Sequence, residues 1–505
     1  MVLRPVRERR GRAAECVRPL PGALLVLLAC LVSPGLRAAT YSVPRFSDTA
    51  IVAGLNQPTD FAFLPDGRIL ILEKPGRVLV AGPSGGATTV ALDMAASVDD
   101  GSEKGLLGIC LHPSFATNGY VYLYYTANGP KNQISRFTLA GSTLGSELVI
   151  LDNIAATFGN HNGGTIAIGP DGKLYAAPGE AGQTSNAQTL SPGNFSGKVL
   201  RMELDGSPAA GNPYLGDGTR EQRIFAHGFR NPFRFSFRPS NGSLYVGDVG
   251  SSGAQDREEV NVVVSGGNYG WPWAEGSTIY TPPCTGCLPP VYDYGRATGT
   301  TIIGGVFVTG NAYPPLTGKY VFADNGASWI RFLEFTAGNA VVGGLQDLAT
   351  SAEGPVAFHQ GPDGNLYYAA INTGRLYRID YARNLFTVPP CRVIDTRGPA
   401  GPTGGPALAA GSNRTFPVAG SCTIPPTARA VAVNVAVTEP TNFGFLTLFP
   451  GGGALPVAST INFAPGQTRA NNATVMLGGS GEIVVRTGMS SGQVHFILDV
   501  TGYYE

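Results

Sequence analysis

Residues 224–272 hold most of the features that decide the fold: IFAHGFRNPFRFSF (224–237), LYVGDVG (244–250) and DREEVNVVVSGGNYGWP (256–272). Two apolar alternating runs flank an Asn-Gly pair, which is a strong short-range pattern for a β-hairpin. A basic Arg-Asn pair and an acidic Glu-Glu pair stand beside these runs, where loops present side chains from a rigid scaffold. We therefore predict one strand–turn–strand unit with polar groups at its ends.

The same unit recurs along residues 48–381, where we count six copies at irregular spacings of roughly 40–70 residues. Three examples are PTDFAFLPDGRILILEKPGRVLV (58–80), GGTIAIGPDGKLYAAPGE (163–180) and GPVAFHQGPDGNLYYAA (354–370). Such repeats are typical of a β-propeller, in which radial closure hides the sheet edges. We predict a six-bladed propeller without long helices, with loops gathered around a central channel. The run at 46–55 is expected to complete the last blade beside 375–381.

The composition changes after Asn384, where charge becomes scarcer and Gly, Ala, Thr and Val more frequent. Short apolar strands separated by Gly, Pro or Asn continue to the C-terminus, a pattern that predicts an antiparallel β-sandwich-like domain. The predicted fold class is therefore all-β. We expect a signal peptide at 1–39, the propeller at 40–384 and a C-terminal β-sandwich module at 385–505.

Overall composition supports this prediction and excludes some partners. The 505 residues include 70 Gly and 39 Pro, and only 14% are charged, which suits many short strands joined by tight turns. The 35 basic and 35 acidic residues cancel. This balance argues against nucleic acid or an anionic membrane as a partner.

The N-terminus has the organisation of an export signal. Several arginines precede the apolar run 22–31, and Ala38-Ala39 offers small residues for cleavage. We therefore expect a secreted or periplasmic protein. Two alternatives remain open: lipidation at Cys30 would anchor the chain to a membrane, and a start site downstream of Met1 would leave the export prediction intact.

Four of the seven cysteines suggest local disulfides. Cys284 and Cys287 stand in the Pro-rich loop TPPCTGCLPP, and Cys391 and Cys422 flank the start of the C-terminal segment. A CxxC pair is also half of a zinc site, but no second CxxC or His pair completes one. A Cys391–Cys422 bridge would contribute about 3–4 kcal/mol by restricting the unfolded chain.

Ionisable residues that could perform chemistry are few. His161 lies in GNHNGG directly before an expected strand. It is either a general base or a loop residue that only forms hydrogen bonds. The pair Arg230-Asn231 opens another strand, where Arg either pairs with an internal carboxylate or holds a ligand bidentately. Glu258-Glu259 would suit calcium, or would belong to a solvated run of charge.

Several motifs in this order resemble the soluble quinoprotein glucose/sorbosone dehydrogenase family, whose members are six-bladed propellers. They are EKGLLGICLHPSF (103–115), NHNGG (160–164), GPDGKLY (169–175), GFRNPFRFSF (228–237), GDVG (247–250) and EEVNVVVSGGNYGWP (258–272). The resemblance spans residues 48–381. It implies an oxidoreductase that uses pyrroloquinoline quinone (PQQ) and calcium to oxidise carbohydrate.

The resemblance also implies roles for residues around the quinone. His161 matches the catalytic base that takes the proton of the sugar's anomeric hydroxyl. Arg230 and Asn231 match a pair that contacts PQQ, with Arg230 polarising its reactive carbonyl. Glu103 stands where family members carry a Gln that touches PQQ, and Asn160 where some carry an Asp beside the base.

Four further residues match calcium-associated positions of the family. Glu259 and Tyr269 form one group, with Tyr269 contributing its backbone. The carbonyl groups of Val249 and Gly250 lie near the position of the cofactor's own calcium, which would draw charge from the quinone as it is reduced.

The chain departs from the family where the last two blades would bind the cofactor. PQQ carries three carboxylates, and glucose-oxidising members hold them with a Lys and two Arg residues. Here the fifth-blade segment YVFADNGASWIRFLEF offers only Arg331, on an expected outer strand, and ATSAEGPVAFHQGPDG offers no basic residue. Each missing charge-assisted contact is worth about 1.5–3 kcal/mol. The paired cysteines resemble a broader branch that includes hedgehog-interacting-protein-like propellers.

Three functions follow. The first is an exported PQQ-dependent aldose dehydrogenase that forms a lactone and passes electrons to an external acceptor. The alternative is a non-catalytic propeller that binds a carbohydrate or a protein and keeps calcium as a structural ion. A different enzyme on the same scaffold, such as a hydrolase using His161 with Glu103 or Asp248, is a third. The C-terminal domain suggests contact with a cell surface or a polysaccharide, or serves as a stabilising cap.

Overall fold

The computed structural model describes residues 39–253, 256–279, 284–382 and 384–505. Residues 1–38 of the signal peptide predicted at 1–39, among them the alternative lipidation site Cys30, lie outside the described residues. Within them the chain is almost entirely β-structure, with the short helices α1 (Phe115–Asn118), η1 (Thr184–Gln188) and η2 (Pro314–Leu316). None of the described helices has the length and apolar character needed to cross a membrane.

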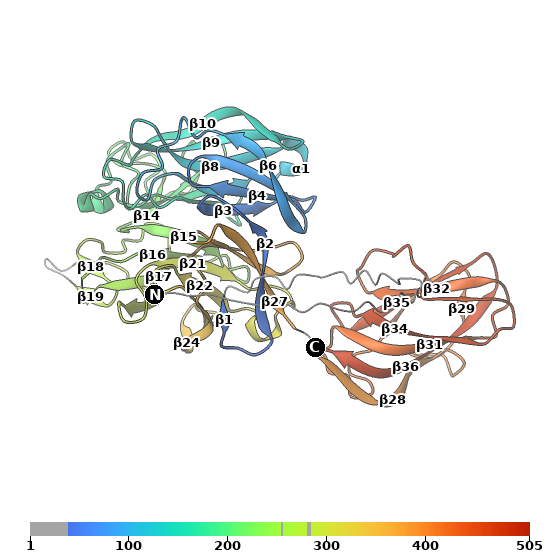
Figure 1. The fold of residues 1–505 in the computed structure, drawn as a ribbon. Helices are drawn as coiled ribbons and strands as arrows, with labels where there is room; N and C mark the ends of the chain where they lie inside the picture. Colours follow the sequence, from blue (N-terminus) through green and yellow to red (C-terminus); the bar gives the residue numbers. More distant parts are fainter. Residues whose placement is uncertain (1–38, 254–255, 280–283, 383) are drawn as a thin grey trace, which may run out of the picture. The chain divides into compact units, whose positions relative to one another are not determined.

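Six antiparallel sheets follow one another from β3 to β27 (Figure 1). The first two comprise β3 (Pro58–Phe63), β4 (Ile69–Glu73), β5 (Arg77–Gly82) and β6 (Gly85–Asp93), then β7 (Leu106–Leu111), β8 (Tyr120–Ala127), β9 (Lys131–Ala140) and β10 (Thr143–Ala155). The next two comprise β11 (Thr165–Ile168), β12 (Leu174–Ala177), β13 (Lys198–Met202) and β14 (Ile224–His227), then β15 (Pro232–Phe237), β16 (Leu244–Asp248), β17 (Arg257–Val263) and β20 (Tyr292–Gly295). The last two comprise β21 (Ile302–Phe307), β22 (Tyr320–Asp324), β23 (Trp329–Phe335) and β24 (Val341–Thr350) with β1 (Thr40–Tyr41), then β25 (Pro355–Gln360), β26 (Leu366–Ala370), β27 (Arg375–Tyr381) and β2 (Phe46–Ala53). A small hairpin, β18 (Ala274–Glu275) with β19 (Thr278–Ile279), precedes β20.

Pro-Asp-Gly turns join the first and second strands where the sequence predicts them. In the turn between β3 and β4, Gly67 adopts φ 89° and its N–H donates to the carbonyl of Leu64. The Asp66 carboxylate accepts from the Arg68 N–H at 3.1 Å. Glycine is favoured at this position because a positive φ carries no Cβ penalty, and the turn fixes the register Phe63↔Ile69.

The first strands of successive sheets contact one another in the order β3, β7, β11, β15, β21, β25 and back to β3. The last of these sheets is completed by β2, which pairs with β27 from Phe46↔Tyr381 to Ala53↔Arg375. This closure by an N-terminal strand was predicted and is confirmed. It leaves the sheets arranged around a centre, and the predicted all-β propeller architecture is confirmed.

The prediction that 224–272 forms one blade is wrong at its start. Strand β14 pairs with β13, the third strand of the preceding sheet, and the following sheet begins at Pro232. The GFRN segment at 228–231 therefore carries the chain from the outer edge of one sheet to the inner strand of the next. Arg230 and Asn231 consequently lie at the start of an inner strand.

Apolar clusters fill the space between neighbouring sheets. One cluster joins the second and third sheets through residues that are fully or almost fully buried: Tyr122, Tyr124, Ile154, Ile166, Leu174 and Leu200. Each such side chain stabilises the fold by about 1.5–3 kcal/mol through removal of apolar surface from water. These apolar clusters hold the inner strands in place, so the loops at the ends of the strands are attached to a rigid support.

The C-terminal region forms two further antiparallel sheets that share one apolar core. The first comprises β28 (Leu385–Asp395), β36 (Gln493–Tyr504), β31 (Ala430–Thr438) and β34 (Arg469–Met476), with β29 (Leu408–Ala409) beside β36, and the second β30 (Asn413–Pro417), β35 (Glu482–Met489), β32 (Gly444–Pro450) and β33 (Ile461–Phe463). Strand β31 alternates buried and half-buried residues, as expected when one face of a sheet packs on a core. The predicted sandwich-like arrangement is therefore observed, while the predicted domain boundaries stay predictions.

Both predicted disulfides are present. Cys284 is bonded to Cys287 with a Cα–Cα distance of 5.6 Å, and Cys391 to Cys422 with a Cα–Cα distance of 5.9 Å. The zinc alternative for the CxxC loop is thereby set aside. Cys110 is free and half-buried.

Candidate functional site

A cavity of about 360 Å³ lies where the loops before the first strands meet those after the second strands. Its wall includes Thr59 and Leu107, at the start of β3 and β7, and Ser251 and Asn325, which follow β16 and β22. Six residues predicted for the site line it: Glu103, His161, Arg230, Asn231, Val249 and Gly250. The fold thus brings together side chains that the sequence spreads over roughly 150 positions.

Arg230 and Asn231 are held by the carboxylate of Asp248 at the end of β16. The Arg230 N–H donates to Asp248 Oδ2 at 3.0 Å and the Asn231 N–H to Oδ1 at 2.6 Å. Burial raises the pKa of Asp248 to about 7, and the two N–H donors and the Arg230 charge oppose that rise. The Arg230 guanidinium donates through Nη1 to the carbonyl of Val249 at 3.0 Å. Arg230 is therefore fixed at its base and along one edge.

His161 is oriented by Glu180, a residue that sequence reasoning missed. Nδ1 of His161 is in hydrogen-bond contact with Glu180 Oε1, and the Glu180 side chain is 1% exposed. An ionised carboxylate only accepts hydrogen bonds, so this contact assigns the proton to Nδ1 and makes Nε2 the nitrogen with a lone pair. A histidine held in this way by a carboxylate can act as a general base.

The backbone of His161 is also specialised. Its φ of 54° is in the left-handed region, and its N–H donates to Glu103 Oε2 at 2.6 Å. The adjacent glycine-rich segment allows close packing, since a Cβ at Gly163 would lie 2.0 Å from the carbonyl oxygen of Ala177. Strain of this kind is found where a side chain must be aimed.

Glu103 and Asn160 complete the surroundings of His161. Besides the His161 N–H, Glu103 Oε2 accepts a long hydrogen bond from Asn231 Nδ2 at 3.5 Å. Asn231 Oδ1 in turn accepts from the Gly163 N–H at 3.0 Å. Asn160 lies at the edge of the site, with Nδ2 3.4 Å from His161 Nε2. Glu103, Asn231 and His161 are therefore one hydrogen-bonded unit.

Three further basic residues that sequence reasoning did not place in the site line the cavity: Lys74, Arg234 and Arg296. Lys74 follows β4 directly, as Val249 follows β16, so its position after a second strand was the available signal. Arg296 precedes β21 in a loop without a family motif. Arg331, predicted on an outer strand, is in β23, the third strand from the centre; it pairs with Asp347 and is absent from the cavity wall.

Arg234 closes the bottom of the cavity. It is buried and donates to the carbonyl oxygens of Thr59 at 2.7 Å, Leu107 at 3.1 Å and Val356 at 3.1 Å. These acceptors belong to the first strands of three sheets, so one guanidinium ties the centre of the ring together. Beyond it a second cavity of about 190 Å³ contains Asp60 and His359.

The residues predicted for the first calcium group lie outside the cavity wall. Glu259 is buried, accepts from Asn261 Nδ2 at 2.8 Å and is in contact with the Gly276 N–H. Tyr269 stacks on Phe229 with ring centroids 4.7 Å apart. The alternative of a solvated acidic run is wrong, because Glu258 is 0% and Glu259 5% exposed.

The donor chemistry around Glu259 suits a hard cation. Burial and the neighbouring carboxylate of Asp248 raise the pKa of Glu259 well above its usual range, and Glu275 adds a third negative group. Carboxylate and carbonyl oxygens are the ligands that calcium takes. As arranged, these carboxylates accept N–H groups, and among the described residues no three His, Cys, Asp or Glu side chains are grouped to hold a metal ion.

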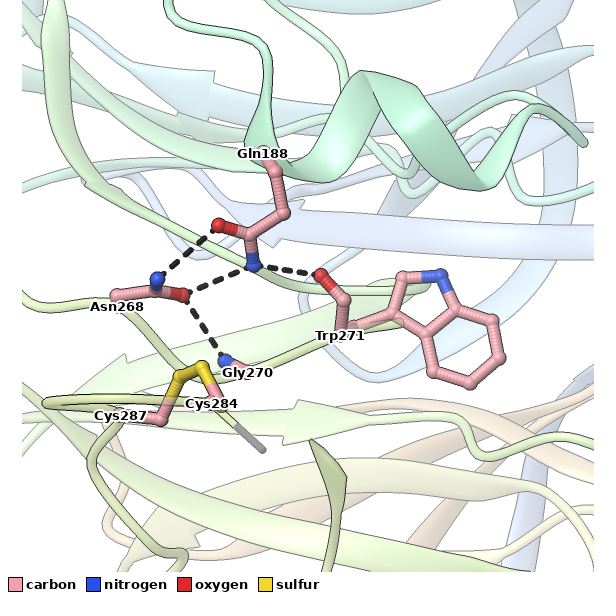
Figure 2. Close-up of a disulfide and its surroundings, with 6 residues drawn as sticks. All are labelled: Gln188, Asn268, Gly270, Trp271, Cys284 and Cys287. Atoms are coloured by element: carbon pink, nitrogen blue, oxygen red, sulfur yellow. Dashed lines mark hydrogen bonds between the residues drawn. A yellow bond between two sulfur atoms is a disulfide. The ribbon is translucent and has the colours of Figure 1, made fainter. Parts of the chain in front are cut away.

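Trp271 lies beside Arg230, whose guanidinium carbon is 5.5 Å from the indole centre. The turn that carries it is fixed by a pair of amide side chains (Figure 2): Gln188 Nε2 donates to Asn268 Oδ1 at 3.0 Å and to the Trp271 carbonyl at 2.7 Å. Asn268 Nδ2 donates back to Gln188 Oε1 at 3.0 Å, and Asn268 Oδ1 accepts from the Gly270 N–H. The Cys284–Cys287 disulfide lies near this turn.

Known proteins are similar to this chain in sequence and in fold. Quinoprotein glucose dehydrogenase B of Acinetobacter calcoaceticus is 30% identical over 290 residues, which cover 51% of this chain and 59% of that protein. The human hedgehog-interacting protein is 27% identical over 315 residues, which cover 55% of this chain and 43% of that protein. This chain thus spans less than two thirds of the length of either relative.

The PQQ-bound structure of an aldose sugar dehydrogenase from Streptomyces coelicolor superposes with a TM-score of 0.57 at 25% identity, covering 69% of this chain and 99% of that one. A family model described as glucose/sorbosone dehydrogenase matches residues 55–378. These residues include every residue that lines the cavity and all six sheets except strands β1 and β2 and the end of β27. On this evidence the chain belongs to the glucose/sorbosone dehydrogenase family.

Proposed function

We propose that this chain is a PQQ-dependent aldose dehydrogenase that oxidises the anomeric hydroxyl of a sugar to a lactone. The observation that carries the proposal is that His161, held by Glu180, lines the same cavity as Arg230. A base and a cation in the wall of one cavity suit the removal of a proton from a hydroxyl group and of a hydride from the carbon that bears it. PQQ, when bound, supplies the two-electron acceptor that takes the hydride.

The chain's own residues would act on the proton and on developing charge. Nε2 of His161 would accept the hydroxyl proton, because Nδ1 is held by Glu180. The resulting imidazolium is stabilised by the buried carboxylate, which keeps its own charge. Arg230, fixed through Val249 and Asp248, would present the remaining N–H groups of its guanidinium to a negative oxygen.

The net positive charge of the cavity lining suits an anionic quinone. Lys74, Arg230, Arg234 and Arg296 outnumber the single carboxylate, that of Glu103, among its lining residues. Asn231 and Glu103 would contact the cofactor, and Asn160 would stand beside the base. Together these residues supply the polar contacts that orient a ligand in a largely preformed pocket.

Calcium is the second part of the proposal. The carbonyl groups of Val249 and Gly250 lie at the cavity wall, where a cation would face an anionic ligand. Glu259, with the backbone of Tyr269, would hold a structural ion, and the mutual repulsion of Glu259 and Asp248 supports this assignment because a cation would relieve it.

We further propose export to the periplasm or beyond, on the basis of the basic and apolar N-terminal sequence. An external acceptor would then receive the electrons. The C-terminal sandwich would contact a cell surface or a polysaccharide.

The test is turnover of a dye. The purified chain is incubated with PQQ and calcium, and reduction of an artificial acceptor is followed with a panel of aldoses. Turnover that disappears in His161→Ala, with quinone affinity retained, supports the proposal. Absence of both quinone binding by calorimetry and turnover would reject it.

The alternative is a non-catalytic binding propeller. The similarity to hedgehog-interacting protein favours it, as does the lack of cations from the last two sheets. Binding of a carbohydrate or protein without any affinity for PQQ would select this function.

A further inference from the structure

The cavity of this chain obtains its positive charge from unexpected places. Within residues 302–381, which form the last two sheets and are all described, no basic residue lines the cavity. Four basic side chains of these sheets are instead paired with carboxylates: Lys319 with Glu334, Arg331 with Asp347, Arg375 with Glu353, and Arg378 with Asp380. Any anion in the cavity must therefore be neutralised from other elements.

We propose that Lys74 and Arg296 bind the carboxylates of the quinone and so replace the cations absent from the last two sheets. The inference rests on the proposed function, because it assigns two binding residues to the same cofactor. Lys74 belongs to the first sheet and Arg296 to the segment between β20 and β21. The two side chains thus approach the cavity from different blades.

Lys74 has unused donors. Its ammonium donates to the carbonyl of Asp100. Because Nζ carries three protons, further donors remain for a ligand. Burial lowers the pKa of Lys74, against the opposing effect of Asp100 and Asp99. An anionic ligand would raise the pKa of Lys74 again, because an opposite charge favours the protonated ammonium.

The local backbone makes room for the Lys74 side chain. Gly105 adopts φ 140°, and a Cβ placed there would lie 2.7 Å from Lys74 Cγ. The Lys74 carbonyl accepts from the Leu106 N–H at 2.9 Å, which fixes the backbone at the cavity rim. The aliphatic part of Lys74 therefore packs over a glycine while its ammonium reaches the cavity wall.

Arg296 is anchored at one nitrogen. Nη1 donates to Glu258 Oε1 at 2.7 Å and to the Thr300 carbonyl at 2.6 Å. Nε is buried and has no hydrogen-bond partner. A buried donor without a partner is unfavourable, so a ligand oxygen that accepts from this edge of the guanidinium would stabilise the site.

The third added cation, Arg234, is not available for this role. Nε and both terminal nitrogens already donate to main-chain carbonyls or to the Thr165 hydroxyl. Its charge contributes to the potential of the cavity, but its N–H groups have protein partners. This difference separates a structural cation from the two proposed ligand-binding cations.

The experiment measures quinone binding without sugar. PQQ and its uncharged trimethyl ester are titrated into the full chain, with calorimetry or quenching of tryptophan fluorescence as the readout. For wild type the acid should bind at least tenfold more tightly than the ester. Lys74→Met and Arg296→Lys should each weaken binding of the acid about tenfold, with little effect on the ester.

Arg296→Lys keeps a positive charge beside Glu258, so the fold is preserved while the planar donor edge is lost. Lys131→Met is the matched control, because Lys131 is a partly exposed lysine of β9 outside the cavity. If wild type binds PQQ and both variants bind it equally well, the inference is overturned while the proposed function stands. If wild type does not bind PQQ, both fail.

Discussion

Nδ1 of His161 contacts the carboxylate of Glu180, which lies 19 positions further along the chain. The two residues are on either side of the β11–β12 hairpin, and the Glu180 N–H donates to the Arg230 carbonyl at 2.9 Å. One short segment therefore links the candidate base to the strand crossing that carries Arg230. The orientation of His161 depends on this contact more than on any residue adjacent to it in sequence.

Replacing Glu180 by Gln should lower kcat by about 10²- to 10⁴-fold, because Gln does not stabilise an imidazolium and permits the wrong tautomer. Quinone affinity should change little, since Glu180 is absent from the cavity wall. Steady-state dye reduction and direct quinone titration measure the two quantities. Equal losses of affinity and kcat would instead show that Glu180 supports the fold of the whole site.

The amide pair Gln188 and Asn268 offers a second test. Removing either side chain, as in Gln188→Ala or Asn268→Ala, should lower the free energy of unfolding by about 2 kcal/mol, because partners are left unpaired. In a double-mutant cycle the two changes should be coupled by roughly 1 kcal/mol. Gln183→Ala, in the exposed part of the same loop, is the control and should have little effect. Strict additivity would contradict the arrangement in Figure 2.

Breaking the Cys391–Cys422 bridge provides a third test. The bridge closes a segment with a sequence separation of 31 residues, and the double replacement by Ser should lower the stability of the C-terminal sheets by about 3–4 kcal/mol. Calorimetry with and without reductant measures this. Reductant should shift the unfolding of wild type toward that of the variant and leave the variant unchanged. A variant that unfolds at the same temperature as the oxidised wild type would show that the bridge does not stabilise the C-terminal sheets.

Sequence reasoning succeeded where local chemistry decides the structure. Alternating runs joined by Pro-Asp-Gly fix strand, turn and register within about twenty residues, so the hairpins were predictable. The β2–β27 closure joins the two ends of the propeller and was predicted from the architecture alone. The same reasoning placed 224–272 in one blade, because periodicity does not show which strand begins a new sheet. That assignment depends on the pairing of β14 with β13 within the third sheet.

The site was predictable only in part, for a related reason. Motifs identified His161, Arg230 and Asn231. Glu180 meets His161 across the β11–β12 hairpin, and Lys74 and Arg296 reach the site through the closure of the ring. No spacing rule connects Lys74 with Arg296, which are brought to one cavity by different sheets. Long-range contacts of this kind are decided by tertiary packing.

The pH dependence of stability gives the last test, through His227 at the end of β14. Its side chain is 8% exposed, Nδ1 has no hydrogen-bond partner, and the cross-strand neighbour is the buried Lys198. Burial lowers the pKa of His227 to about 4, and the charges of Lys198 and Arg220 add to this effect. At pH values between these two pKa values, His227 is neutral in the folded protein and protonated in the unfolded chain, where its pKa is about 6.5.

Because the unfolded state binds the additional proton, stability should fall as the pH drops from about 6.5 to about 4. After a discount for partial solvent access, His227 should account for roughly 2 kcal/mol of that fall. His227→Gln removes the titrating group, so its free energy of unfolding should decrease less over this range than that of wild type. Urea unfolding at pH 8 supplies the baseline, since His227 is neutral there in both states. Parallel curves for the two proteins between pH 7 and pH 4 would show that His227 is protonated in the folded protein as readily as in the unfolded chain.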